Sequence, residues 1–434
     1  MRFAPTLLIP GLILALSAGT WARNGLEASP TPAAQSKGAD GPLHKPAPRE
    51  EAKTAVVNMK LLAPGIGWVV ANHWRLTVND GSEVANGTGI YWTTDNGAHW
   101  REITPPITSK MDIADVFFLD THRGWAIFEQ SEDTLYRTPS DWQEKVQLAL
   151  ATTTDAGATW SKMPFTLMLK DYLPKDRLWT LNNAVRVSRI AFVDPLHGWL
   201  QLSYSMGLHG NNSLLLLTSN GGRTWREASA YPGPNSSDML LLTPNEGWVF
   251  GSVSPDGSPC LFVTGDGAKS WQELSADPPT LPLGKLESAD CDVYGLPVFE
   301  NPTHGYLREG CTDAPVYSMH TTVLFATNDD GRTWKLDRMI KNVDGQCNSS
   351  AITDSVWVAP VMSNGHVTLL HVGAGATIDA GRNNASISGN SMCDTGLSLV
   401  TPTQGWMSDD SGELRSTTDG GQTWTTITPG RNRK

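Results

Sequence analysis

The residues with the clearest chemical potential are carboxylates that recur within one eight-residue phrase, T-x-D-x-G-x-T-W. Repeated carboxylates could bind Ca²⁺, but a calcium ion takes about 6–8 oxygen ligands that converge on it. Each copy of the phrase supplies one acid, so the phrase alone does not build such a site. The six copies place the central Asp or Asn, and the closing Trp, at Asp95 and Trp100, Asp155 and Trp160, Asn220 and Trp225, Asp266 and Trp271, Asp329 and Trp334, and Asp419 and Trp424.

Each residue type in the phrase has a role in building a turn between two strands. An Asp or Asn side chain accepts hydrogen bonds from exposed N–H groups of a turn, and Gly adopts a backbone angle that other residues resist. The Thr hydroxyl can tie the two strand ends together, and the Trp ring can cover the turn. We therefore assign the phrase a structural role and expect no catalytic residue, metal site or cofactor in it.

A second feature precedes each copy in fixed order, namely a Gly followed by an aromatic residue. It occurs at Gly67-Trp68, Gly124-Trp125, Gly198-Trp199, Gly247-Trp248, Gly305-Tyr306 and Gly405-Trp406. An eroded seventh copy is expected at residues 365–384, with Gly365-His366 in place of Gly-Trp and Asp379 as the central acid. A propeller blade of four short strands needs about 40–50 residues. The repeat therefore predicts a seven-bladed β-propeller, with six blades as the fallback.

Each repeat reads as short strands separated by turns. In the second repeat the strand-like runs are Asp115–Asp120, Trp125–Gln130 and Val146–Thr153, which is typical of antiparallel all-β structure. The first strand is expected at Thr54–Leu62 and the last at Trp424–Pro429. An all-β domain of four-stranded antiparallel blades is thus expected over residues 54–430.

The segment ahead of this domain is expected to direct export. Residues 1–22 combine a cationic start, an apolar run over Leu7–Leu16 and small residues after it, as a secretory signal peptide does. Residues 23–53 are rich in Ala, Pro, Lys and Glu and are expected to form a disordered tether. We expect a periplasmic or extracellular protein without a transmembrane span after signal removal. The net charge of −11 argues against a nucleic-acid partner.

Five cysteines occur in the chain, and an odd number in an exported protein leaves at least one unpaired. Cys291 with Cys311, and Cys347 with Cys393, are candidate disulfides. Cys260 lies in an apolar run and is expected to be a buried thiol. The alternative is that all five are reduced core residues.

The repeated phrase resembles the Asp-box, or bacterial neuraminidase repeat. The further pattern F-x-D-x-x-x-G-W, present as FFLDTHRGW (Phe117–Trp125) and FVDPLHGW (Phe192–Trp199), resembles the photosystem II stability and assembly factor group and its relatives in non-photosynthetic bacteria. The resemblance covers nearly all of residues 55–430. It implies a propeller and does not imply photosynthesis.

The enzyme hypothesis is a secreted glycosidase of the exo-alpha-sialidase type. The resemblance would then require an Arg cluster, a Tyr nucleophile with a Glu partner, and a further acid. The start of the expected propeller, TAVVNMKLLAPGIGW, lacks the Phe-Arg-Ile-Pro-like phrase of sialidases. With 44 acidic residues, the sequence cannot select a pair of carboxylates for glycoside hydrolysis.

The favoured hypothesis is a non-catalytic scaffold for protein binding or assembly. Three insertions, at Glu129–Lys145, Leu167–Asn183 and Ser275–Gly295, are expected to lengthen loops on one face of the propeller. Aromatic and Arg residues often anchor partners, and the candidates are Trp142, Tyr172, Arg177 and Trp179; packing of the loop itself explains them equally well. We expect a protein or peptide partner, with a glycan as a further candidate.

Overall fold

The computed structural model describes residues 52–76, 83–106, 111–130, 145–168, 185–205, 211–229, 231, 235–252, 259–274, 290–293, 295–312, 319–341, 351–353, 356–363, 366–373, 379–380, 396–409 and 411–430. The chain divides into two compact units, Met1–Arg49 and Glu50–Lys434. All described residues belong to the second unit, so the expected signal peptide and nearly all of the expected tether lie outside them. Among the described residues no helix is long and apolar enough to cross a membrane.

The described residues form seven antiparallel sheets, which we call blades 1 to 7 in chain order. Blade 1 contains β1 (Ala52–Ala63), β2 (Ile66–Leu76), β3 (Glu83–Thr93) and β4 (Arg101–Glu102). Blade 2 contains β5 (Met111–Phe118), β6 (Gly124–Gln130), β7 (Lys145–Thr153) and β8 (Ser161–Met168). Blade 3 contains β9 (Arg186–Phe192), β10 (Gly198–Ser205), β11 (Asn211–Thr218) and β12 (Arg226–Glu227).

The remaining blades follow the same order of strands. Blade 4 contains β13 (Asn235–Leu241), β14 (Gly247–Ser252), β15 (Pro259–Thr264) and β16 (Gln272–Leu274). Blade 5 contains β17 (Asp290–Val293), β18 (Val298–Phe299), β19 (Gly305–Thr312), β20 (Met319–Thr327) and β21 (Lys335–Lys341). Blade 6 contains β22 (Ala351–Thr353), β23 (Val356–Ser363), β24 (His366–Gly373) and β25 (Asp379–Ala380), and blade 7 contains β26 (Gly396–Leu399), β27 (Gly405–Ser408), β28 (Leu414–Thr417) and β29 (Thr425–Ile427).

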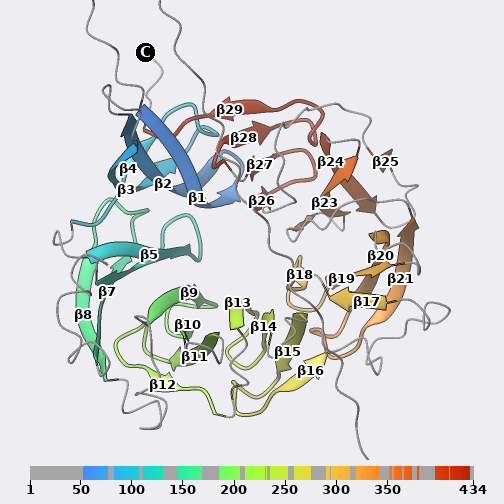
Figure 1. Ribbon diagram of the computed structural model, residues 1–434, viewed down its shortest axis with the longest axis horizontal. Helices are drawn as coiled ribbons and strands as arrows, with labels where there is room; N and C mark the ends of the chain where they lie inside the picture. Colours follow the sequence, from blue (N-terminus) through green and yellow to red (C-terminus); the bar gives the residue numbers. More distant parts are fainter. Residues whose placement is uncertain are drawn as a thin grey trace, which may run out of the picture. The chain divides into compact units, whose positions relative to one another are not determined.

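Within the second unit the blades follow one another around a ring (Figure 1), with β1, β5, β9, β13 and β26 on its inner side. β1 contacts β26 of the last blade, so the first and last blades meet. The backbone N–H of Leu61 donates to Ser398 Oγ at 2.9 Å, and the N–H of Val56 donates to the carbonyl oxygen of Gly412 at 2.8 Å. The prediction of an all-β propeller with four-stranded antiparallel blades is therefore confirmed.

Aromatic residues interlock the blades. The Trp of the Gly-Trp pair packs against the following blade, as Trp125 does on Phe192 at a centroid distance of 3.9 Å and Trp248 on Phe299 at 5.0 Å. Trp406 of blade 7 lies 5.7 Å from Trp100 of blade 1. Trp248 and Trp406 have no exposed surface, so these indoles form the core between blades.

Blade 6 corrects the expected register of the seventh copy. In the other blades the Gly of the Gly-aromatic pair lies opposite the first Thr of the phrase, as Gly67 does opposite Thr93. In blade 6 these two positions are Val356 and Gly373. His366 begins the third strand instead of the second, and Asp379 lies on the fourth strand, opposite His371, instead of in the turn. The assignment of Asp379 as a central acid was wrong because the residues at the phrase positions in this register, from Gly373 onward, are not Thr, Asp and Gly.

Candidate binding site

The phrase residues form one hydrogen-bond pattern in six blades. In blade 2 Thr153 Oγ1 donates to Asp155 Oδ1 at 2.7 Å and accepts from the N–H of Gly157 at 2.9 Å. The same Asp155 oxygen accepts the N–H of Thr159 at 2.8 Å, and Oδ2 accepts its hydroxyl at 2.6 Å. Corresponding turns carry Asp95, Asn220, Asp266, Asp329 and Asp419.

These contacts hold the carboxylates in their charged form. Hydrogen bonds from Thr159 and Thr153 lower the pKa of Asp155 to about 2, and similar bonds lower the pKa of Asp329 and Asp419. In blade 3 Asn220 keeps the geometry, because its Oδ1 accepts the N–H of Thr224 and its Nδ2 donates to the Thr224 hydroxyl at 2.8 Å. All the oxygens of this pattern are thus directed at their own turn.

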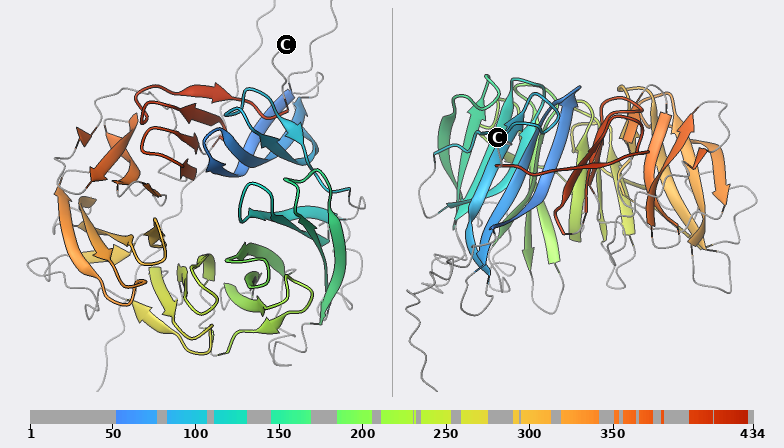
Figure 2. Two further views of the ribbon diagram at one scale, coloured as in Figure 1. Left: turned by 180° about the vertical axis from the view of Figure 1, so that it is seen from behind. Right: turned by 90° about the horizontal axis from the view of Figure 1, so that it is seen from above.

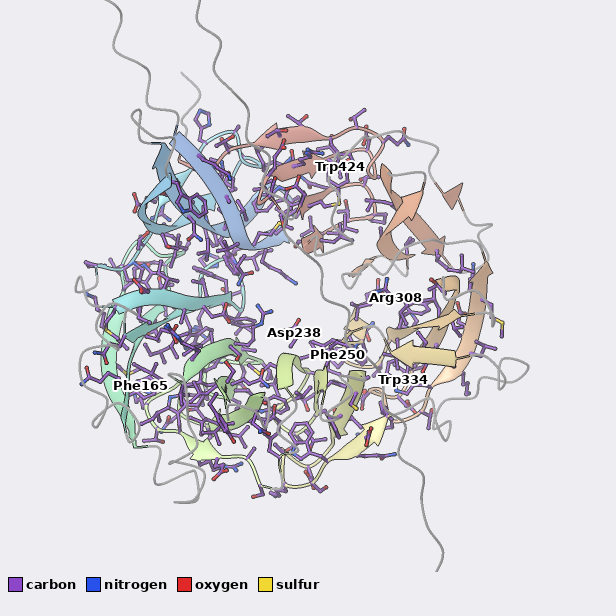
Figure 3. All side chains as sticks on the ribbon, viewed as in Figure 1. Phe165, Asp238, Phe250, Arg308, Trp334 and Trp424 are labelled. Atoms are coloured by element: carbon purple, nitrogen blue, oxygen red, sulfur yellow. The ribbon has the colours of Figure 1, made fainter. Side chains whose placement is uncertain are left out.

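Several of the Trp residues that close the phrase contact a neighbouring blade. Trp160 Nε1 donates to the carbonyl oxygen of Ile103 in blade 1 at 2.7 Å, and Trp271 lies 5.8 Å from Trp199 of blade 3. Trp225 contacts Phe165 of blade 2, which Figure 3 labels on the outer part of that blade. A Trp ring of the phrase, expected to cover its own turn, can thus also contact the neighbouring blade.

Sequence reasoning missed a second acid that shapes the neighbouring turn. Asp120 Oδ1 accepts the N–H groups of His122 and Arg123, both at 2.7 Å, and Asp194 Oδ1 does the same for Leu196 and His197 at 2.7 and 2.8 Å. These are the Asp residues of the F-x-D-x-x-x-G-W pattern, so the signal was present in the sequence. The turn between the first and second strands and the turn that carries the phrase contact each other, as the bond from Ala156 N to the His122 carbonyl oxygen shows.

The ring therefore has two unlike faces (Figure 2). One face, which we call the box face, carries the phrase turns and the turns between first and second strands. The three expected insertions join strand ends on the opposite face, since they follow β6, β8 and β16 and precede β7, β9 and β17. The candidate anchors Trp142, Tyr172, Arg177 and Trp179 lie outside the described residues.

The structure describes three of the five cysteines, namely Cys260, Cys291 and Cys311. The register pairs Cys291 of β17 with Cys311 of β19 across the sheet, so the backbone brings these two positions together. Cys347 and Cys393 lie outside the described residues. Cys260 on β15 is half-buried instead of buried.

A cavity of about 920 Å³ lies on the inner wall of the ring. Its lining comes from the inner strands β1, β5, β9 and β26 of four blades, together with residues of β2, β3 and β27. The lining residues of β5, β9 and β26 stand near the starts of their strands, which are the ends away from the box face. The side chains that give the cavity its character are Val57, Asn58, Asp112, Asp115, Arg189 and Asp409.

The inner strands share a local irregularity at this wall. The cross-strand register shifts between Val56 and Asn58 in β1, between Ile113 and Asp115 in β5, and beside Ser188 in β9. The extra residues, Val57, Ala114 and Ser188, all line the cavity. A β-bulge leaves its extra residue outside the pairing and redirects side chains, so three blades use the same device to shape one wall.

The residue after each bulge joins a polar chain that links blades. Asn58 Nδ2 donates to Asp115 Oδ1 at 3.0 Å, and the N–H of Ile190 donates to Asp115 Oδ2 at 2.8 Å. Arg189 Nε donates to Asp238 Oδ1 at 3.0 Å, and Figure 3 shows Asp238 on the inner side of the ring. A second ion pair, Arg186 with Glu129 at 2.9 Å, joins β9 to β6 nearby.

Burial at the inner wall shifts the pKa values of its ionisable side chains. Burial raises the pKa of Asp115, and the Arg189 charge and the N–H of Ile190 offset this only in part. Burial likewise raises the pKa of Glu129 despite its bonds to Val187 and Arg186. Burial lowers the pKa of Arg189, but Asp238 and Asp115 raise it more, so the net direction is upward.

The arrangement differs from what sialidase chemistry would need. Among the described residues that line the cavity, Arg189 is the single arginine and no tyrosine is present. Arg189 and Arg186 each bind a carboxylate of the protein itself. Tyr91 lies opposite Glu102, but this pair is on β3 and β4, away from the inner strands. Within the described residues no group of three or more His, Cys, Asp or Glu side chains is placed to hold a metal ion.

Comparisons with known proteins give structural likenesses alone. No protein-family model matches the chain, and no curated protein matches it. The chain is similar to the solved structure of YCF48 bound to D1 peptide (17% identity, 74% of this chain and 85% of that chain, TM-score 0.38). It is also similar to YCF48 from Cyanidioschyzon merolae (14% identity, 75% and 88%, TM-score 0.39) and to a Trypanosoma rangeli sialidase (13% identity, 73% and 54%, TM-score 0.38). At these identities and TM-scores the likenesses assign no ligand or activity to this chain.

Proposed function

We propose that this protein is an exported, non-catalytic β-propeller scaffold that binds a segment of a protein or peptide on its inner wall. The observation that carries the proposal is the cavity of about 920 Å³ whose lining combines aliphatic and charged side chains from four blades. Ligand sites generally have volumes of about 300–1,000 Å³ and combine apolar walls with a few placed polar groups. This cavity has the size and the mixture that such a site needs.

The distribution of polar contacts supports binding over catalysis. The cavity arginine is bound to Asp238 and is therefore a poor clamp for a substrate carboxylate. The repeated acids are occupied by their own turns. The residues left for a ligand are an exposed aliphatic side chain, Val57, and the exposed carboxylate of Asp112, a set that suits recognition better than glycoside hydrolysis.

Export is supported by the sequence of residues 1–22 and by the composition of residues 23–53. We expect the mature chain in the periplasm or the medium when the full gene is expressed in a bacterial host. Fractionation with mass spectrometry of the N-terminus tests this. An intact N-terminus on a protein found in the cytoplasm would contradict it.

The binding proposal is tested with a photo-reactive phenylalanine placed at one exposed position at a time. Val57 is 57% exposed on the cavity wall, and Leu196 is 49% exposed on the box face, so Leu196 is a matched control. Illumination with a fluorescent library of extended peptides should label the variant at position 57 and leave the variant at position 196 unlabelled. Equal labelling, or none at position 57, would overturn the proposal.

The glycosidase alternative is tested on the same protein. A fluorogenic sialoside should be hydrolysed no faster with the protein than without it. Turnover that disappears when Arg189 is replaced by Ala would favour the enzyme instead.

A further inference from the structure

The cavity wall carries more carboxylates than cations. Asp112, Asp115 and Asp409 line it, against Arg189 alone among the described lining residues, but Asp409 is paired with Arg415 at 3.7 Å and Asp115 is buried. Arg189 is shared between Asp238, at 3.0 Å from its Nε, and the charge of Asp115. Its positive charge is therefore compensated within the wall, and an incoming ligand would meet the exposed Asp112 carboxylate.

One of these acids lies opposite a further acid, outside the lining, across a pair of strands. Asp112 of β5 is the cross-strand partner of Glu129 of β6, and the Asp112 charge contributes to the raised pKa of Glu129. Like charges directly opposite one another on a sheet are unfavourable. Arg186 compensates Glu129 at 2.9 Å, whereas the exposed Asp112 carboxylate faces the cavity with no ion pair among the described residues.

An apolar contact lies beside these charges. The bulge in β1 places Val57 in the cavity lining with 57% of its surface exposed, and the half-buried Met59 lines the same wall. A ligand that covered Val57 would gain free energy, because removal of apolar surface from water is favourable. The wall thus offers an aliphatic contact and an unneutralised acid next to each other.

We propose that the segment bound in this cavity is an extended peptide with a lysine or arginine beside an aliphatic residue. The cation is recognised by the exposed Asp112 carboxylate, and the aliphatic residue covers Val57. The inference rests on the proposed function and names the chemistry of its partner. Complementary charge across an interface selects against partners of the wrong sign, so acidic segments are excluded by the same wall.

Four synthetic peptides that differ at one position test this. Each has the same alternating valine and serine sequence, with Lys, Arg, Gln or Glu at the centre, and its affinity for the full chain is measured by fluorescence anisotropy. The Lys and Arg peptides should bind about tenfold more tightly than the Glu peptide, with the Gln peptide between them. Added salt should reduce the difference. Spermidine, a cation without the aliphatic contact, should bind about tenfold more weakly than the Lys peptide.

Two variants test whether the preference for the Lys peptide comes from the cavity wall. Asp112→Asn should remove most of the preference for Lys over Gln, whereas Asp337→Asn, a change at an exposed acid on β21, should leave it unchanged. If the four peptides bind equally well, or if the Glu peptide or spermidine binds best, the inference is wrong and the binding function stands. If no peptide binds and position 57 gives no photo-adduct, both proposals fail together.

Discussion

The phrase turns on the box face and the bulged strands of the inner wall both rely on polar side chains. In the turns these side chains bond within one blade, whereas at the inner wall they bond to the next blade. In the turns, the same pattern recurs in six blades, with Asn220 in place of Asp in blade 3 and Ala268 in place of Gly in blade 4, and each set bonds to itself. At the inner wall the corresponding residues differ from blade to blade, as Asn58, Asp115, Arg189 and Asp238 do, and they bond to the next blade. The residues that recur from blade to blade therefore stabilise the fold, and the residues that differ at equivalent positions form the candidate site.

Blade 6 refines this comparison. It keeps four paired strands, β22 to β25, although Gly373 stands where the other blades have the first Thr of the phrase. The phrase is therefore not required for a blade to form a sheet. Its contribution lies in the turn and in the contact with the neighbouring blade.

The largest effect is expected where blades interlock. Trp248 has no exposed surface and packs on Phe299 of blade 5, so Trp248→Ala should lower the free energy of unfolding by about 3–5 kcal/mol. Val57→Ala, at the cavity wall, should change it by less than about 0.5 kcal/mol. Urea unfolding followed by tryptophan fluorescence measures both. If the two variants lose similar free energy of unfolding, the claim that the blade contacts carry stability and the cavity wall does not is wrong.

A smaller loss is expected at a phrase glycine. Gly331 has a φ of 76°, and a Cβ there would lie 2.5 Å from the rigid ring of Trp248. Gly331→Ala should cost about 1–3 kcal/mol. Gly87 also has a positive φ, of 112°, but open space around it, so Gly87→Ala isolates the backbone cost. Equal losses at both positions would show that contact with the preceding blade is unimportant.

The smallest effect concerns acid pH. The folded-state pKa of Asp155 is depressed to about 2, below its value of about 3.9 in the unfolded chain. The stability that this carboxylate contributes is therefore present above about pH 4 and is lost as the pH falls towards 2. Asp155→Asn should flatten the decline of stability between pH 4 and 2. An unchanged slope would contradict the assigned hydrogen bonds.

The fold could be predicted from the sequence because its signals are local and repeated. The residues of each phrase act within one turn and its contact with the neighbouring blade, so their spacing alone indicates a blade. The position of Asp379 is not predictable in this way, because TIDAGRNN keeps the Thr, Asp and Gly of the phrase while the pairing of β23 with β24 sets a different register.

The candidate site was not predictable in the same way. Asn58 and Asp115 are 57 residues apart, and Asp115 and Ile190 are 75 residues apart, so no spacing rule joins them. The bulges that redirect Val57, Ala114 and Ser188 carry no Gly or Pro signal. One clue was available, since polar residues such as Asp115 interrupt runs that otherwise read as apolar strands.

The most direct test of the central claim measures stability and affinity on the same two variants. Thr327→Val removes a buried hydroxyl that holds Asp329 and Gly331, and Asp112→Asn changes one exposed acid of the cavity wall. The account predicts that Thr327→Val lowers the free energy of unfolding by about 1–3 kcal/mol and leaves the affinity for the Lys peptide unchanged. It predicts that Asp112→Asn weakens this affinity about threefold, to near that of the Gln peptide, and leaves stability unchanged. A variant at the phrase that abolishes binding while the protein stays folded, or a loss of stability without a loss of affinity at Asp112, would contradict it.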